Sequence, residues 1–224
     1  MTFKEHSEAF LRQNGIRINP NLPELTAGEF RTQEEMLRRG VCAFLAAQIA
    51  IDVVNGRNGR ESAEFFRDIL ERFGLADELT PDEHRLFALA DGADGSDLPE
   101  TFANAMAWRI EMCMPLFRAC GMLRDGMAYP DHPSDPMPVI VCIRGCEDYE
   151  ALKKACGTPA DKTQRMSGAD LIYRMDWACV DARLNGRQAP GGLNYDVVVE
   201  QHKGFLWMIG AYDAENWDTV KPHT

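Results

Sequence analysis

The chain has 224 residues, of which 45% are hydrophobic and 26% are charged, a composition typical of a globular protein long enough to bury a sizeable core. Lys and Arg total 24 against 35 Asp and Glu, so the formal net charge is -11. This charge repels phosphate backbones and anionic lipids, so it argues against nucleic-acid and membrane-surface binding, and it suits solubility or a basic protein partner.

The N-terminal residues are charged and lack the hydrophobic region of a signal peptide. The longest apolar stretch, residues 40–51, is shorter than the roughly 20 residues that span a bilayer. The seven cysteines are an odd set, embedded mostly in apolar helical patterns, and in a chain without an export signal we expect them to be reduced thiols. These features predict a cytoplasmic protein.

Four helices are predicted in the first half of the chain, over residues 3–14, 32–54, 61–73 and 80–90. Thr32 and Thr80 each begin a capping box, in which a hydroxyl and the Glu three residues later bond free backbone N–H groups. The middle of the second helix is apolar nearly all round, which predicts that it lies at the centre of a helical bundle. The Asp/Gly-rich residues 91–97 are expected to form a loop.

A long helix is predicted over residues 98–120. Its apolar positions are spaced by four and three, at Phe102, Met106, Ile110, Cys113, Phe117 and Cys120. Pro115 is predicted to lie on the opposite, polar side with Asn104 and Glu111. It should bend the helix, because the carbonyl of Glu111 loses its hydrogen-bond donor.

Residues 125–138 contain four prolines and are expected to be irregular. Residues 139–143 are compatible with a short strand or a buried helical turn, and periodicity does not decide between them. Three further helices are predicted, over 146–156, 169–185 and 195–209.

The fold class is therefore predicted to be all-α. We expect one irregular helical bundle of about seven or eight helices, with at most one short strand near 139–143. The whole chain, residues 1–224, is expected to form a single domain.

His202 lies at the centre of the apolar face of the last predicted helix. Its neighbours on that face are Val198, Val199, Phe205, Leu206 and Ile209. A buried imidazole needs at least one hydrogen-bond partner. His202 is therefore either a general base or ligand, or a hydrogen-bonded core histidine, and the second role is the commoner one.

Charged residues divide the 169–185 helix into two polar wedges between apolar flanks. Asp176 and Arg183 share one wedge, and Asp170, Arg174 and Asp181 form the other. A helix that is apolar on two flanks is packed between neighbours, so these charges should form buried or half-buried ion pairs. Such pairs more often order a core than catalyse a reaction.

Arg109 falls beside the apolar stripe of the 98–120 helix. Its guanidinium requires a carboxylate there, and Asp176 and Asp181 are candidate partners.

Signatures of known catalytic and cofactor sites are missing from the sequence. It has no His-Glu-x-x-His, Cys-x-x-Cys, phosphate-binding loop, Gly-x-Gly-x-x-Gly or Gly-x-Ser-x-Gly motif. The set Cys142, Cys146, Cys156 and His132 is irregularly spaced for zinc, and a calcium-like loop at Asp91 has Phe102 where a glutamate is needed. No metal or other cofactor is expected.

Four stretches of the chain carry the motifs of one family: 14–23, Trp108-Arg-Ile-Glu111 through Gly121, Trp177 through Asn194, and Val199-Glu-Gln-His-Lys-Gly-Phe-Leu-Trp207. They resemble the bacterial family known as domain of unknown function 4272. The likeness covers nearly the whole chain, is strongest after residue 170 and is weak between 125 and 165. It implies a bacterial intracellular setting, and it brings no activity.

The chain departs from that family's pattern at several positions. Gln201 replaces an expected arginine, Phe205-Leu206 replace Leu-Asn, and Pro115 and Arg118 interrupt the Trp-Arg-x-Glu helix. A family site that used the replaced arginine or asparagine would be incomplete here.

Two functions remain in competition. The first is a non-enzymatic binding or regulatory protein, which fits the acidic charge and the missing catalytic signatures. The second is a small-molecule hydrolase with His202, Asp176 and Asp181 as catalytic residues and with Arg109 and Arg183 as anion-binding residues. A cleft containing these groups favours the enzyme, and a closed core in which they pair favours the binding protein.

Overall fold

The computed structural model describes residues 1–92, 98–124 and 129–223. Within these ranges the secondary structure consists of nine α-helices and short 3-10 turns, with no strand. The α-helices are α1 (Phe3–Gln13), α2 (Gln33–Val54), α3 (Gly59–Arg72), α4 (Pro81–Asp91), α5 (Glu100–Ala119), α6 (Met137–Arg144), α7 (Tyr149–Ala155), α8 (Lys162–Leu184) and α9 (Tyr195–Ile209). The all-α prediction is confirmed, with slightly more helices than the seven or eight expected.

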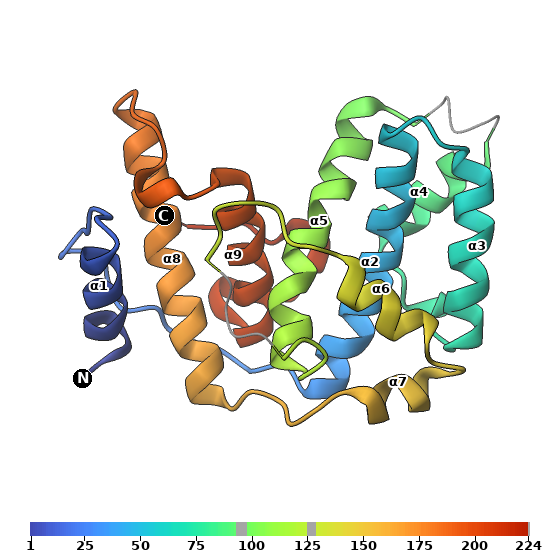
Figure 1. The fold of residues 1–224 in the computed structure, drawn as a ribbon, viewed down its shortest axis with the longest axis horizontal. Helices are drawn as coiled ribbons and strands as arrows, with labels where there is room; N and C mark the ends of the chain where they lie inside the picture. Colours follow the sequence, from blue (N-terminus) through green and yellow to red (C-terminus); the bar gives the residue numbers. More distant parts are fainter. Residues whose placement is uncertain (93–97, 125–128, 224) are drawn as a thin grey trace.

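The longer helices form a row across the molecule. They follow the order α1, α8, α9, α5 and α2, and then α3 with α4 (Figure 1). Helix α2 packs against α5 on one side and against α3 and α4 on the other, which buries its apolar circumference. One cluster of buried hydrophobic residues runs through all of these contacts. The order along the chain is not the order in space, since α8 and α9 lie between α1 and α5.

Capping explains where most helices begin. Thr32 and Thr80 form the predicted capping boxes at the starts of α2 and α4. Helix α8 begins at Lys162 rather than at residue 169, because Asp161 and Gln164 form a further capping box that the sequence analysis missed. The extra turns include Arg165, whose guanidinium donates a hydrogen bond to the carbonyl oxygen of Arg31, just before α2.

Residues 139–143, for which a strand was one alternative, belong to the helix α6. Val139 and Ile143, four residues apart, are buried, and Val141 between them is exposed. Pro138 is tolerated in the first turn of this helix, where the backbone N–H groups have no intrahelical partner. A lone strand here would leave its backbone groups unpaired, whereas a helix satisfies them internally.

The predicted polar side of α5 is wrong in the second half of the helix: Asn104 is exposed, but Glu111 and Pro115 are both buried. Helix α9 covers that side of α5, and Gly204 makes the close approach possible. A Cβ atom at Gly204 would lie 2.2 Å from the carbonyl oxygen of Met112 and 3.0 Å from the ring of Pro115. These two residues therefore face other parts of the protein rather than solvent.

Two predicted segments fall partly outside the described residues. The loop over 91–97 includes residues 93–97, and the proline-rich segment 125–138 includes residues 125–128. In the described ranges no helix is long and apolar enough to cross a membrane.

Candidate functional site

His202 and Asp176 meet between α8 and α9. Nδ1 of His202 lies 2.7 Å from Oδ2 of Asp176, and neither residue is exposed to solvent. The ring of Tyr173 lies beside the imidazole, with 5.8 Å between ring centroids. The predicted burial of His202 is thus confirmed, and its partner is one of the carboxylates that the sequence analysis named.

The surroundings of this pair are closed. Nε2 of His202 is buried without a hydrogen-bond partner among the described residues. Neither His202 nor Asp176 lines the three large cavities found in the same ranges. A substrate in any of those cavities would not touch the imidazole, so the pair has the environment of a core hydrogen bond.

Asp181 and Arg183, the other candidates on α8, lie away from His202. Asp181 accepts hydrogen bonds from Arg17 at 3.1 Å and from Arg187 at 2.6 Å. The guanidinium of Arg183 lies over the ring of Tyr195, 4.6 Å from its centroid. The structure brings neither residue to the His202 pair. Their roles as catalytic and anion-binding residues stay predictions.

The second polar wedge of α8 contains a buried ion pair. Arg174 donates two hydrogen bonds of 2.9 Å to the carboxylate of Asp170, and a third, of 3.2 Å, to the carbonyl oxygen of Pro23. This pair confirms the predicted buried ion pair and holds the segment before α2 against α8.

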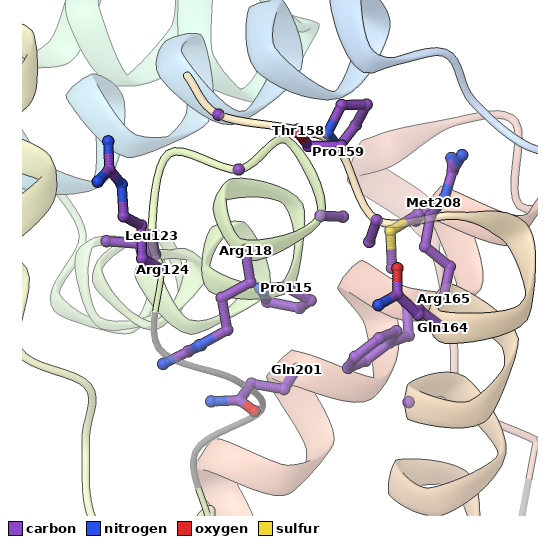
Figure 2. A pocket seen from close by; sticks show the side chains of 16 residues that line it. Pro115, Arg118, Leu123, Arg124, Thr158, Pro159, Gln164, Arg165, Gln201 and Met208 are labelled. Atoms are coloured by element: carbon purple, nitrogen blue, oxygen red, sulfur yellow. The ribbon is translucent and has the colours of Figure 1, made fainter. Parts of the chain in front are cut away.

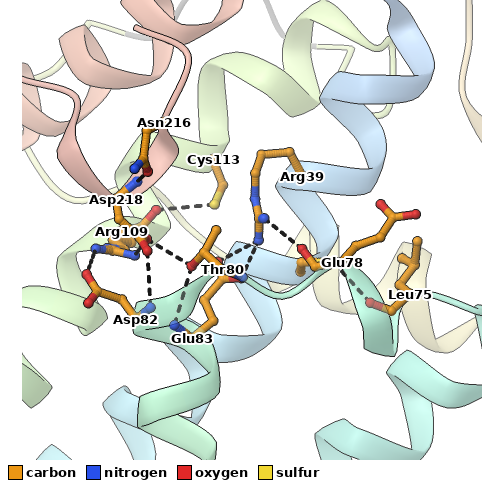
Figure 3. Close-up of polar contacts among 11 residues, drawn as sticks. Arg39, Leu75, Glu78, Thr80, Asp82, Glu83, Arg109, Cys113, Asn216 and Asp218 are labelled. Atoms are coloured by element: carbon orange, nitrogen blue, oxygen red, sulfur yellow. Dashed lines mark hydrogen bonds and ion pairs between the residues drawn. The ribbon is translucent and has the colours of Figure 1, made fainter.

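Arg109 on α5 pairs with carboxylates that the sequence analysis did not consider. Its Nη1 donates to Asp218 and its Nη2 to Asp82, each over 2.6 Å (Figure 3). The candidate partners Asp176 and Asp181 are therefore wrong. The correct ones come from α4 and from the last 3-10 turn (Trp217–Thr219), two elements that only the folded chain places beside α5.

Asp218 extends this network to the start of α4. It accepts hydrogen bonds from the hydroxyl of Thr80 at 2.8 Å and from the backbone N–H of Asp82 at 3.1 Å. Glu83, fully buried, completes the capping box with Thr80 and also pairs with Arg39 of α2, with 2.6 Å between Nη2 and Oε1 (Figure 3). The network joins α2, α4, α5 and the C-terminal turn, so its charges stabilise the packing of these elements.

Glu111 is another buried carboxylate, and it accepts hydrogen bonds from three donors. It accepts hydrogen bonds from the backbone N–H of Ser134 at 2.6 Å, from its hydroxyl at 2.9 Å, and from Nε2 of Gln201 at 3.0 Å. Glu111 therefore holds the segment before α6 against α5 and α9. Helical periodicity placed Glu111 on the polar side of α5 with Pro115, so this role was not predicted.

A cavity of about 680 Å³ lies between α5, α8, α9 and residues 157–160. We call it the arginine pocket, because Arg118, Arg124 and Arg165 line it. Figure 2 shows Arg118 and Gln201 extending their polar ends toward the same side, with Arg165 beside Met208 on the other side. The remaining lining is mainly small or apolar.

The described residues that line the arginine pocket carry only positive charges. No Asp or Glu is among the described residues that line it, although the chain as a whole has a net charge of -11. Arg165 is held in place by a 2.7 Å hydrogen bond to the carbonyl oxygen of Arg31. Gln201, only 3% exposed, is held by Glu111, and Arg124 is exposed at the rim. This pocket is not predicted from the sequence, because Arg165 lies on α8, whereas Arg118 and Arg124 lie at and just after the end of α5.

Three of the cysteines are poor nucleophiles at neutral pH. Burial raises the pKa of Cys42 and of Cys179 to about 12 and that of Cys156 to about 11. All three are free thiols, and they stay protonated at pH 7. Throughout the described residues there is no cluster of three or more His, Cys, Asp or Glu side chains that could hold a metal ion.

Comparison with known proteins identifies one family. The family described as domain of unknown function (DUF4272) matches residues 3–220 of the 224 residues. No curated protein and no solved structure is detectably similar to the chain.

Proposed function

The chain belongs to the DUF4272 family, and we propose that it is a non-enzymatic binding protein that takes a small anionic molecule in the arginine pocket. We also infer a bacterial, cytoplasmic setting, which the seven free cysteines support because buried thiols persist in a reducing compartment. A basic protein partner for the acidic surface stays a prediction that rests on net charge.

The observation that supports the proposal is the positive charge of the residues that line the pocket. Arg124 and Arg165 line it together with Arg118, which has an interaction partner of its own, and no carboxylate is among the described lining residues. Its volume of about 680 Å³ lies within the range of small-molecule sites, roughly 300–1,000 Å³. Guanidinium groups present planar pairs of donors that match carboxylate and phosphate oxygens. A local positive region in a chain of net charge -11 favours such anions over cations.

The hydrolase alternative has weaker support. It requires His202 to reach a substrate, but the imidazole is fully buried and hydrogen-bonded to Asp176. The two arginines proposed to bind its substrate are occupied elsewhere, Arg109 by two carboxylates and Arg183 by the ring of Tyr195. The groups that suggested an enzyme therefore do not share a cleft.

The test is calorimetric titration with two probe anions, inorganic pyrophosphate and citrate. We expect at least one to bind, with an affinity that falls as salt is added. Arg124→Gln and Arg165→Gln should each weaken binding by roughly tenfold or more, since hydrogen bonds to charged groups contribute about 1.5–3 kcal/mol. Arg72→Gln, at an exposed arginine outside the pocket, is the matched control for the lost charge.

Two results would count against this proposal. One is that neither anion binds the wild-type protein. The other is that Arg72→Gln weakens binding as much as the pocket variants do, which would mean that the anions respond to overall charge.

A further inference from the structure

The arginine pocket has an apolar wall as well as charged groups. Three of its apolar residues keep accessible surface: Leu123 and Ala160, which are half-buried, and Pro159, which is exposed (Figure 2). The ring of Phe205, which is 7% exposed, also lines the pocket. Most of the accessible surface of the lining is apolar. A molecule in the pocket therefore meets apolar side chains together with guanidinium groups.

Backbone hydrogen bonds hold part of this apolar wall in place. The N–H of Gly157 donates to the carbonyl oxygen of Gly121, and the N–H of Ala160 donates to that of Ala119, each over 2.9 Å. The chain between these two bonds, which includes Pro159, is thereby tied to the end of α5. The wall is thus formed before a ligand arrives, as is usual for small-molecule sites.

Two guanidinium groups of the pocket can donate to a bound anion. Arg124 is exposed, and it makes no hydrogen bond or ion pair within the described residues. Arg165 is half-buried and uses Nη1 for the carbonyl oxygen of Arg31. Its Nη2 makes no hydrogen bond within the same residues and is not among the enclosed atoms. A carboxylate or phosphate oxygen accepts such donors readily.

From these observations we propose that the arginine pocket takes an amphipathic organic anion, with a carboxylate or phosphate group for the arginines and an apolar body for the wall. This inference rests on the proposed function, because it needs an anion to bind in this pocket, and it adds the chemistry of the rest of the molecule. An apolar body gains free energy by leaving water for the wall around Leu123 and Pro159, whereas a small polar anion leaves that wall hydrated.

The test compares three probes. Naphthoate has both the charge and an apolar body, naphthamide has the same body without the charge, and acetate has the charge without the body. Their dissociation constants are measured by NMR titration at constant ionic strength. We expect naphthoate to bind roughly tenfold or more tightly than either of the others, because each of them lacks one of the two contributions. The resonances that shift should belong to residues that line the pocket.

Variants assign the two parts of the ligand to the two parts of the pocket. Arg165→Gln should weaken naphthoate by roughly tenfold and leave naphthamide unchanged, which also shows that the protein stays folded. Leu123→Ser and Pro159→Ser should each weaken both naphthyl probes by about threefold or more, because they reduce the apolar wall. Val141→Ser, at an apolar residue that is 63% exposed and outside the pocket, is the matched control and should change none of the affinities.

The outcomes that would overturn this inference are separable from failure of the proposed function. If pyrophosphate or citrate binds but naphthoate binds no more tightly than acetate, the pocket takes anions and has no use for an apolar body. If naphthamide binds as tightly as naphthoate, the pocket takes apolar molecules whatever their charge, which contradicts both proposals. Naphthoate binding that neither wall variant weakens would place the apolar body elsewhere on the protein.

Discussion

The imidazole of His202 and the carboxylate of Asp176 join two neighbouring helices through a hydrogen bond of 2.7 Å, and both side chains are completely enclosed. A polar pair of this kind orders the contact between α8 and α9 when both partners are present. Removing one partner leaves a buried polar group unsatisfied, which costs more than the pair itself contributes.

We therefore expect His202→Gln to lower the free energy of unfolding by about 1–3 kcal/mol, and Asp176→Asn to have an effect of similar size. The double variant should be less destabilised than the sum of the two, because the residues are in contact. Urea unfolding of the four proteins measures this coupling. His6→Gln, at an exposed position on α1, should change stability by less than about 0.5 kcal/mol. Strictly additive effects would contradict the pairing.

The Arg109 network should hold the C-terminal turn in place. Asp218→Asn removes a charge that meets Arg109, Thr80 and the backbone of Asp82. Since breaking a buried ion pair costs about 3–5 kcal/mol, we expect a loss near the lower end of that range and faster proteolysis after residue 210. Arg187→Gln breaks only the half-exposed pair with Asp181 and should cost under about 1 kcal/mol. Equal stability losses in the two variants would argue against the network.

Gly204→Ala should be strongly destabilising. The added Cβ would lie 2.2 Å from the carbonyl oxygen of Met112, which belongs to the backbone and has little freedom to move. We expect α9 to be forced from α5 at a cost of about 1–3 kcal/mol or more, measured by thermal unfolding. Gly157→Ala is the control, since its nearest new contact would be at an ordinary 3.4 Å. A Gly204→Ala protein as stable as this control would mean that the two helices are further apart.

Stability should fall at alkaline pH because of the buried thiols. Burial raises the pKa of Cys42 and of Cys179 from the ordinary value of 9.0 to about 12 in the folded protein. The unfolded chain therefore loses these protons first, and the free energy of unfolding should decrease as pH rises above about 9, by up to about 1.4 kcal/mol per pH unit for each thiol. Urea unfolding between about pH 8 and pH 10 measures the slope. The slope should be shallower in Cys179→Ala, and an identical slope would exclude a contribution from this thiol.

The prediction of a single domain is tested by cutting the chain after residue 168. That fragment lacks α9, most of α8 and the C-terminal turn, which cover α1 and α5. The exposed apolar surface should make residues 1–168 insoluble or without a cooperative melting transition, as calorimetry would detect. A soluble fragment that melts cooperatively would show that the chain contains two independent units.

Local chemistry in the sequence determined where most helices lie. Thr32 and Thr80 begin their helices as expected, because a capping box needs only residues three positions apart. Asp161 and Gln164 form the same kind of capping box at the start of α8, and their spacing is also visible in the sequence. The burial of His202 also followed from the sequence, since its helical neighbours on the same face are apolar.

Tertiary structure alone decided which residues meet across the row of helices. Helical periodicity placed Glu111 and Pro115 on the polar side of α5, yet α9 covers that side. The close approach is possible because Gly204 has no side chain. The partners of Arg109 come from segments far apart in the chain, and the arginine pocket joins Arg165 of α8 to Arg118 and Arg124 at and just after the end of α5. Helical periodicity fixes the direction of a side chain about the helix axis. Long-range pairing depends on which helix packs against that face, and the spacing of residues along the chain does not encode the identity of this neighbour.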